Sequence, residues 1–219
     1  MDYIKFAKEQ NIKFQEGIKR VEENRKKWEN LKLRVEAYYK PLLKELKEHF
    51  KFEFFYLSFS EDYLEKKQSL NQNFIQISMG SHPVGIISNI KDAKTNEKSG
   101  IISEKGGTLS FSQGPQGEVM VLIYSCKSEV FKFEDDYIVY GIYKSPEKIT
   151  KNRMSRIIKF YFKFMYITSI VGKSSTSDRL LINFVKMRGK FDLIKFGSSA
   201  LKIFKGLLDT TFKANGLSK

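Results

Sequence analysis

The stretch from residue 106 to residue 125, GGTLSFSQGPQGEVMVLIYS, constrains the fold more than any other part of the sequence. Gly114, Pro115 and Gly117 mark a turn between two strand-like runs, so the stretch predicts a β-hairpin. The second run is apolar on both sides, with Val119, Val121 and Ile123 on one face and Met120, Leu122 and Tyr124 on the other. Such a strand needs protein against both faces, and this predicts a sheet with covering layers.

Other apolar, β-branched and aromatic runs predict the remaining strands, at residues 52–59, 74–79, 84–90 and 137–143. We expect a turn at residues 80–83, a polar loop at residues 91–98 and a short helix at residues 60–70 between these strands.

The two ends of the chain have helical patterns and supply the material that can cover the sheet. We therefore predict an α+β fold with a central antiparallel or mixed sheet. Residues 1–50 form a long helical arm, residues 51–144 a β-rich core, and residues 145–219 a basic helical region. The basic region packs on the sheet and forms one composite domain with the core.

Residues 145–172 carry start and stop signals for one long helix. Ser145 is a good N-cap, Pro146 fits the first helical position, and Glu147 suits the positive end of the helix dipole. Gly172 is the residue type that most readily closes a helix. The apolar run at residues 157–171 is too short to cross a bilayer and contains two lysines, so we predict no transmembrane span.

Residues 4–39 have the pattern of an unusually long helix, with a moderate heptad repeat that continues to residue 49. Pro41 predicts an end or kink, followed by a short helix at residues 42–50. The arm either self-associates or binds a partner helix through residues 4–49, or it packs within the chain against the C-terminal helices. We favour packing within the chain.

The chain has a formal net charge of +14, and residues 151–219 contribute +12 of it. A further helix from about residue 177 carries Leu180, Leu181, Phe184, Met187 and Phe191, and a last helix follows from about residue 199. Cations interleaved with aromatic side chains are typical of nucleic-acid channels and of membrane-surface helices. The predicted phosphate contacts are Arg156, Lys159, Lys163, Lys186, Arg188 and Lys190.

No motif in the sequence indicates a catalytic residue or a cofactor. The acidic residues Glu134, Asp135 and Asp136 are weak candidates for a metal site, as is the group around Asp62. Cys126 and His82 could form a nucleophile–base pair, although a cysteine that follows a buried strand is usually a core residue.

The first hypothesis is therefore a non-enzymatic module that binds nucleic acid through the basic helices. The alternatives are a peripheral membrane-surface or protein-assembly component that uses the same tail and arm, and a metal-dependent hydrolase or nuclease. With one cysteine and no apolar signal segment, the chain is expected to be cytoplasmic, with a place at the membrane surface as the alternative.

Overall fold

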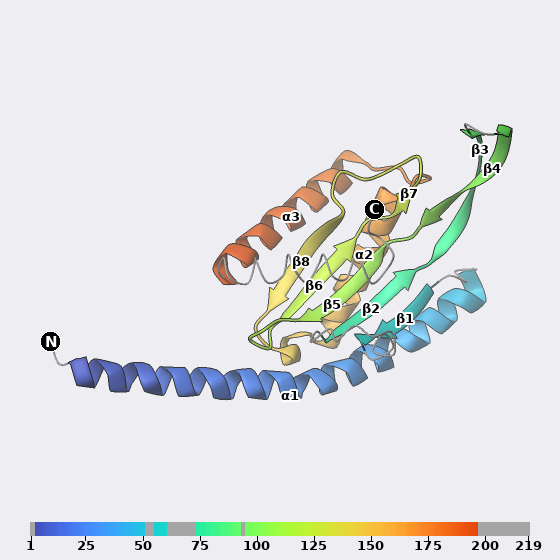
Figure 1. Cartoon of the computed structure of the whole chain (residues 1–219). Coiled ribbons are helices and arrows are strands. Elements are labelled where there is room, and N and C mark those ends of the chain that lie inside the picture. Colours follow the sequence, from blue (N-terminus) through green and yellow to red (C-terminus); the bar gives the residue numbers. More distant parts are fainter. Residues whose placement is uncertain (1–2, 51–54, 61–72, 93–94, 197–219) are drawn as a thin grey trace.

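The computed structural model describes residues 3–50, 55–60, 73–92 and 95–196, and its centre is a five-stranded sheet (Figure 1). All its neighbouring strands are antiparallel, in the spatial order β1-β2-β5-β6-β8. These strands are β1 (Phe55–Phe59), β2 (Phe74–Met79), β5 (Thr108–Gln113), β6 (Val119–Tyr124) and β8 (Tyr137–Tyr143). The sheet and its helices confirm the predicted α+β class, and the predicted hairpin is β5 and β6.

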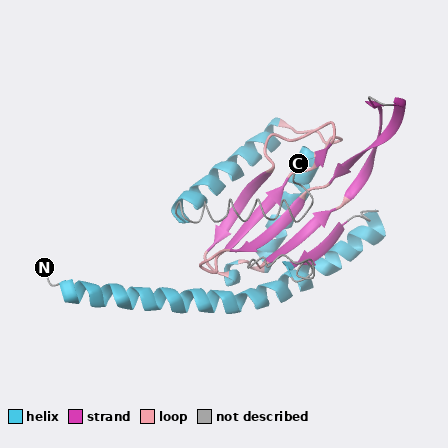
Figure 2. Ribbon diagram, in the orientation of Figure 1, coloured by secondary structure: helices cyan, strands magenta, loops and turns pink. Residues whose placement is uncertain are grey.

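A second sheet of three strands continues from the first (Figure 2). It contains β3 (Ser81–Asp92), β4 (Thr95–Lys105) and β7 (Lys127–Ser128). Gly80 alone separates β2 from β3, so the turn predicted at residues 80–83 is wrong. The loop predicted at residues 91–98 is also wrong for residues 91–92 and 95–98, which belong to β3 and β4, with Asp92 paired to Thr95; residues 93–94 lie outside the described residues.

Strand β6 divides the core into two clusters, as its two apolar faces predicted, and all six of its residues are buried. Val119, Val121 and Ile123 join the larger cluster, which also contains side chains of α1 (Tyr3–Phe50) and α2 (Lys151–Thr168). The other face packs with Val139 and Ile142 of β8 and with Leu193 of α3 (Thr176–Phe196).

Helix α1 is one continuous helix of 48 residues, so the predicted break at Pro41 is wrong. Pro41 has no N–H group, so the carbonyl of Ala37 lacks its usual hydrogen bond within the helix. Both residues are exposed, so water can donate a hydrogen bond to this carbonyl instead. Trp28, Val35 and Tyr39 are fully buried in the sheet cluster, whereas residues 3–16 are exposed. The second half of the heptad pattern therefore packs within the chain. It contacts the sheet at β1 and the predicted C-terminal helical region at residues 146–148 and α2.

The single helix predicted at residues 145–172 is divided in the structure. Ser145 precedes only a short 3-10 helix, η2 (Pro146–Lys148), and α2 begins after Thr150 and ends at Thr168. Ile149 between them is fully buried, and its non-helical backbone separates the two elements. Gly172 lies beyond the helix end, where a Cβ atom would collide with the carbonyl oxygen of Tyr166.

Helix α3 confirms the helix predicted from residue 177, but all five apolar residues that marked it are exposed to solvent. Ile182 and Val185 are the side chains that α3 buries in the larger cluster. No helix in the described part of the chain is long and apolar enough to cross a membrane. The helices predicted at residues 60–70 and from residue 199 fall outside the described residues, apart from Ser60.

Candidate anion-binding site

Three arginines line one pocket where β8, the start of α2 and the second half of α3 meet. The pocket has a volume of about 280 Å³. Its lining consists of Tyr140, Gly141, Ile142, Tyr143, Arg153, Arg156, Arg188 and Asp192. This convergence of cations from separate elements is the most distinctive chemical feature of the described structure.

After β8 the chain reverses direction through η2, and this reversal places the first turns of α2 beside the end of β8. Helix α1 holds this segment, because Arg34 donates hydrogen bonds to the carbonyl oxygens of Pro146 and Ile149 at 2.9 and 3.1 Å. Tyr39 donates another to the carbonyl of Met154 at 3.0 Å. Arg153 and Arg156 are three positions apart and so share one side of α2.

Gly189 brings α3 close to the same strand. A Cβ atom at this position would collide with the carbonyl oxygen of Val139, so a glycine permits this close packing of helix on strand. The preceding residue, Arg188, donates a hydrogen bond to the carbonyl of Tyr140. Gly189 is therefore a packing contact inside α3.

Aromatic rings support two of the three guanidinium groups. The Arg188 Cζ atom lies 4.9 Å from the centre of the Tyr140 ring, and the Arg153 Cζ atom lies 5.3 Å from that of Tyr143. Arg153 also donates to the carbonyl of Lys148, and Arg156 to that of Asn152 at 3.4 Å. A guanidinium has five N–H donors, so each arginine retains donors for a ligand.

The pocket has an excess of positive charge. Asp192 is its one acidic lining residue, which leaves a net charge of +2 on the lining. Burial raises the pKa of Tyr143, with a further contribution from Tyr140, while the charges of Arg188 and Arg153 act in the opposite direction. Gly141 leaves additional space in the pocket, where a Cβ atom would make ordinary van der Waals contact with Tyr143 Oη at 3.6 Å and with Asp192 Oδ2 at 3.8 Å.

The structure brings together only part of the predicted set of phosphate contacts. Arg156 and Arg188 line the pocket, and Lys159 is exposed one turn further along α2. Lys163 is paired with Asp178 at 2.5 Å, and Lys186 with Asp135. Lys190 is exposed on α3, outside the pocket lining.

Sequence reasoning did not include Arg153, Tyr140 or Tyr143 in the site. The available signal for Arg153 was its spacing of three residues from Arg156. For the two tyrosines there was no signal, because their role depends on how the segment after β8 folds back over the strand.

The acidic residues considered for a metal site are engaged with lysines. Asp136 lies 3.0 Å from Lys127 and 3.4 Å from Lys132, and Asp135 pairs with Lys186. Partial burial would raise the pKa of Asp136, but the two lysines outweigh it and lower the pKa. No group of three or more metal-ligating side chains occurs within the described ranges, and Asp62 lies outside them.

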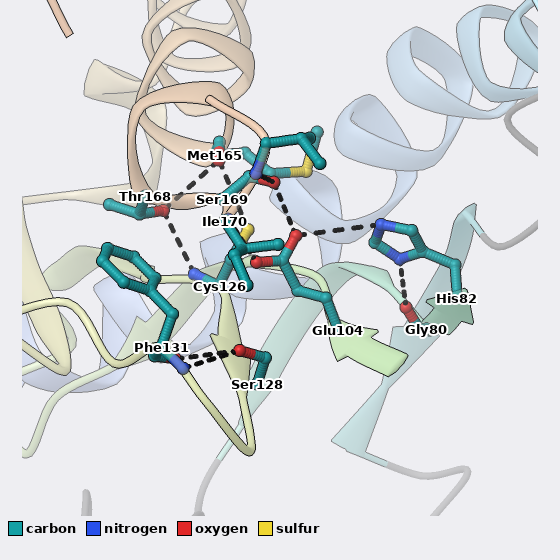
Figure 3. Close-up of polar contacts among 11 residues, drawn as sticks. Gly80, His82, Glu104, Cys126, Ser128, Phe131, Met165, Thr168, Ser169 and Ile170 are labelled. Atoms are coloured by element: carbon teal, nitrogen blue, oxygen red, sulfur yellow. Dashed lines mark hydrogen bonds and ion pairs between the residues drawn. The ribbon is translucent and has the colours of Figure 1, made fainter. Parts of the chain in front are cut away.

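A second polar cluster, around Glu104, lies at the opposite end of α2 (Figure 3). The Glu104 carboxylate is buried, and it accepts hydrogen bonds from Ser169 Oγ at 2.6 Å and from the Ile170 amide at 2.7 Å. His82 Nε2 lies 3.9 Å from the same carboxylate. The cluster joins β4 to the end of α2 and gives each oxygen of the buried acid one hydrogen-bond donor.

Cys126 and His82 take different partners in this region (Figure 3). The Cys126 thiol donates to the carbonyl of Met165 at 3.3 Å, whereas the His82 ring faces Glu104 and Gly80. Burial, helped by the charge of Glu104, raises the pKa of Cys126 to about 11. The thiol is therefore protonated at neutral pH and unsuited to act as a nucleophile.

Comparison of the chain with protein-family models, with curated proteins and with solved structures gives no match.

Proposed function

We propose that the protein is a non-enzymatic module that binds nucleic acid by its phosphates, with the arginine pocket as the anchor. The observation that carries the proposal is the meeting of Arg153, Arg156 and Arg188 in one pocket. The planar fork of a guanidinium matches two phosphate oxygens at once, which makes arginine the preferred side chain for this contact.

The outer face of α2 offers a continuation of the pocket. Arg156 belongs to the pocket lining and also begins an exposed stripe that continues through Lys159 to Lys163. The rise from Arg156 to Lys163 is about 10 Å along the helix. Lys163 is already paired with Asp178, so Lys159 is the cation best placed to meet the next phosphate.

Fluorescence anisotropy with labelled single- and double-stranded DNA and RNA, at two salt concentrations, tests this proposal. The variant replaces Arg153, Arg156 and Arg188 with Gln. We expect binding to weaken about 100-fold and the log–log salt slope to fall by about 0.7–0.9 for each phosphate that the variant no longer neutralises. An unchanged affinity and slope would refute the pocket as the anchor.

A matched control removes the same charge from a distant exposed surface. Lys8, Lys13 and Lys19 lie on the exposed first half of α1, so their replacement with Gln leaves the pocket intact. We expect this control to bind within about twofold of the wild-type protein, because each distant charge is screened at physiological salt. A loss equal to that of the arginine variant would mean that net charge alone drives binding.

A second candidate function is docking of α3 on an anionic membrane surface. Phe191 and Ile194 are 72% and 71% exposed, and they continue a stripe with Leu180, Phe184 and Met187 at helical spacing. Arg179, Lys190 and Lys195 are exposed on the same helix. Apolar side chains beside cations are the combination by which a surface helix binds anionic lipid.

Co-sedimentation with vesicles separates the two candidates. Docking predicts binding to vesicles that contain phosphatidylserine, weaker binding to phosphatidylcholine alone, and loss of binding in Phe184→Ser/Phe191→Ser. Binding that is independent of the anionic lipid or of these two rings would refute the docking proposal. A cytoplasmic location and self-association through residues 4–49 stay predictions.

A further inference from the structure

The size of the arginine pocket limits what can enter it. Its volume of about 280 Å³ is slightly smaller than that of pockets that enclose a whole drug-sized ligand. The pocket therefore has room for one phosphate group and part of the sugar that carries it. A continuous strand would have to pass over its mouth.

The charge of the lining sets a second limit. The three guanidiniums exceed the single carboxylate of Asp192 by two charges. A phosphate monoester carries about −1.5 to −2 charges at pH 7, with a second pKa near 6. A phosphodiester within a strand carries only one negative charge. The lining therefore complements a terminal phosphate better than an internal one.

The arginines are held in place before any ligand arrives. Tyr140 and Tyr143 support the faces of two guanidiniums, and backbone carbonyls accept one hydrogen bond from each of the three arginines. Neither contact neutralises the positive charge. Little side-chain entropy is then lost on binding, which favours a compact ligand of high charge.

We infer that the arginine pocket binds the terminal phosphate of a nucleic-acid strand, with the following phosphates running along α2 past Lys159. This inference rests on the proposed function and adds to it a preference for phosphorylated strand ends. The exposed stripe of α2 that leaves the pocket at Arg156 favours a strand end over an isolated phosphate group.

The test compares single-stranded oligonucleotides of one sequence that carry a 5′-phosphate, a 3′-phosphate or hydroxyl groups at both ends. Competition against a labelled strand should show about tenfold tighter binding for one of the two phosphorylated forms. The preference should decrease as the pH falls below 6, because the monoester then loses its second charge. This pH dependence needs no variant and so cannot be confused with misfolding.

Two variants link the preference to the pocket. In Arg153→Gln/Arg188→Gln the ratio of affinities for phosphorylated and hydroxyl ends should fall to about one. Gly141→Ala should lower this ratio of affinities without removing a charge. The added methyl group takes up space in the pocket and lies at ordinary contact distance from its neighbours. Lys13→Gln, on the exposed arm, should leave the ratio unchanged.

The outcomes separate this inference from the proposed function. Equal affinity for all strand ends, with binding still lost in the arginine variant, overturns the preference for ends and leaves nucleic-acid binding in place. Absence of binding to any strand overturns both. A phosphoserine peptide that binds as tightly as the phosphorylated strand overturns the assignment to nucleic acid.

Discussion

The two ends of α2 both hold charged side chains, but their surroundings differ. At the C-terminal end, Glu104 is fully buried and its carboxylate is hydrogen-bonded to Ser169 and to the Ile170 amide. At the N-terminal end, Arg153 and Arg156 lie at an open pocket. No carboxylate within the described residues forms an ion pair with either of them at 4.0 Å or less.

The charge of Glu104 helps to hold the fold together, whereas the charges of Arg153 and Arg156 are available to a ligand. A buried carboxylate costs several kcal/mol unless donors compensate it, and Glu104 also lies at the helix end that repels anions. Its donors are therefore a structural requirement. The arginines keep contact with water and have donors to spare, so a ligand can use them.

The largest effect is expected from Glu104→Ala. Removal of the carboxylate leaves the Ser169 hydroxyl and the Ile170 amide without their acceptor, so the free energy of unfolding should fall by about 3–4 kcal/mol. Urea denaturation followed by circular dichroism measures this loss. Glu104→Gln keeps one oxygen acceptor and should cost less than half as much. Equal stability of Glu104→Ala and wild type would show that the two helix ends do not differ in this way.

The next effect concerns alkaline pH and the buried thiol of Cys126. Its pKa is about 11 in the folded protein, against an ordinary value of 9.0. The unfolded chain therefore loses this proton first, so the stabilisation is complete below pH 9 and is lost as the pH rises through 11. The free energy of unfolding of the wild type, minus that of Cys126→Ala, should fall by about 2–3 kcal/mol between pH 8 and pH 11. Burial, and after it the charge of Cys126, raise the pKa of Tyr161, so the tyrosine contributions cancel only in part in this difference. A constant difference would contradict the prediction.

At the other end of α2, Arg188→Gln should affect binding more than stability. The loss of one charge-assisted hydrogen bond to phosphate predicts about tenfold weaker binding to nucleic acid, while the free energy of unfolding changes by less than about 1 kcal/mol. Anisotropy titration and urea denaturation of the same preparation give both numbers. A large loss of stability with normal binding would reverse the roles that we assign to the two ends.

The smallest effects on binding are expected for two lysines on the same face of α2. Lys159→Gln should weaken binding about two- to threefold, because its ammonium is exposed. Lys163→Gln should change binding less, because Asp178 already holds that ammonium. The hydrogen bond from Lys163, together with two from Ser175, lowers the pKa of Asp178 to about 2. Salt titrations of both variants measure the difference. The reverse order would show that the ion pair opens when nucleic acid binds.

Much of the fold could be predicted from local patterns. The two apolar faces of β6 require covering layers, and the structure provides them. The predictions that proved wrong concern places where tertiary contacts override the local sequence pattern. Pro146 starts a helical turn as expected, but the Ser145 side chain makes no capping hydrogen bond, and the turn ends at Ile149, which is buried. Pro41 did not break α1, because its missing hydrogen bond faces water.

The candidate site was less predictable, because charge in a sequence does not reveal its partners. Lys163 and Lys186 were predicted to contact phosphate, yet Asp178 and Asp135 pair with them. Asp135 is 51 residues from Lys186, beyond the reach of any helical spacing rule. The tyrosine supports under Arg153 and Arg188 depend equally on contacts between separate elements.

The exposed first half of α1 has a consequence for how the molecule moves in water. Residues 3–20 extend about 27 Å along the helix axis, more than the radius of gyration of about 17 Å of a compact chain of this length. A rod of this length on a rounded body gives the particle a friction that depends on direction. Rotation about the axis of α1 is then faster than end-over-end tumbling, and the sedimentation coefficient is lower than that of a sphere of equal mass.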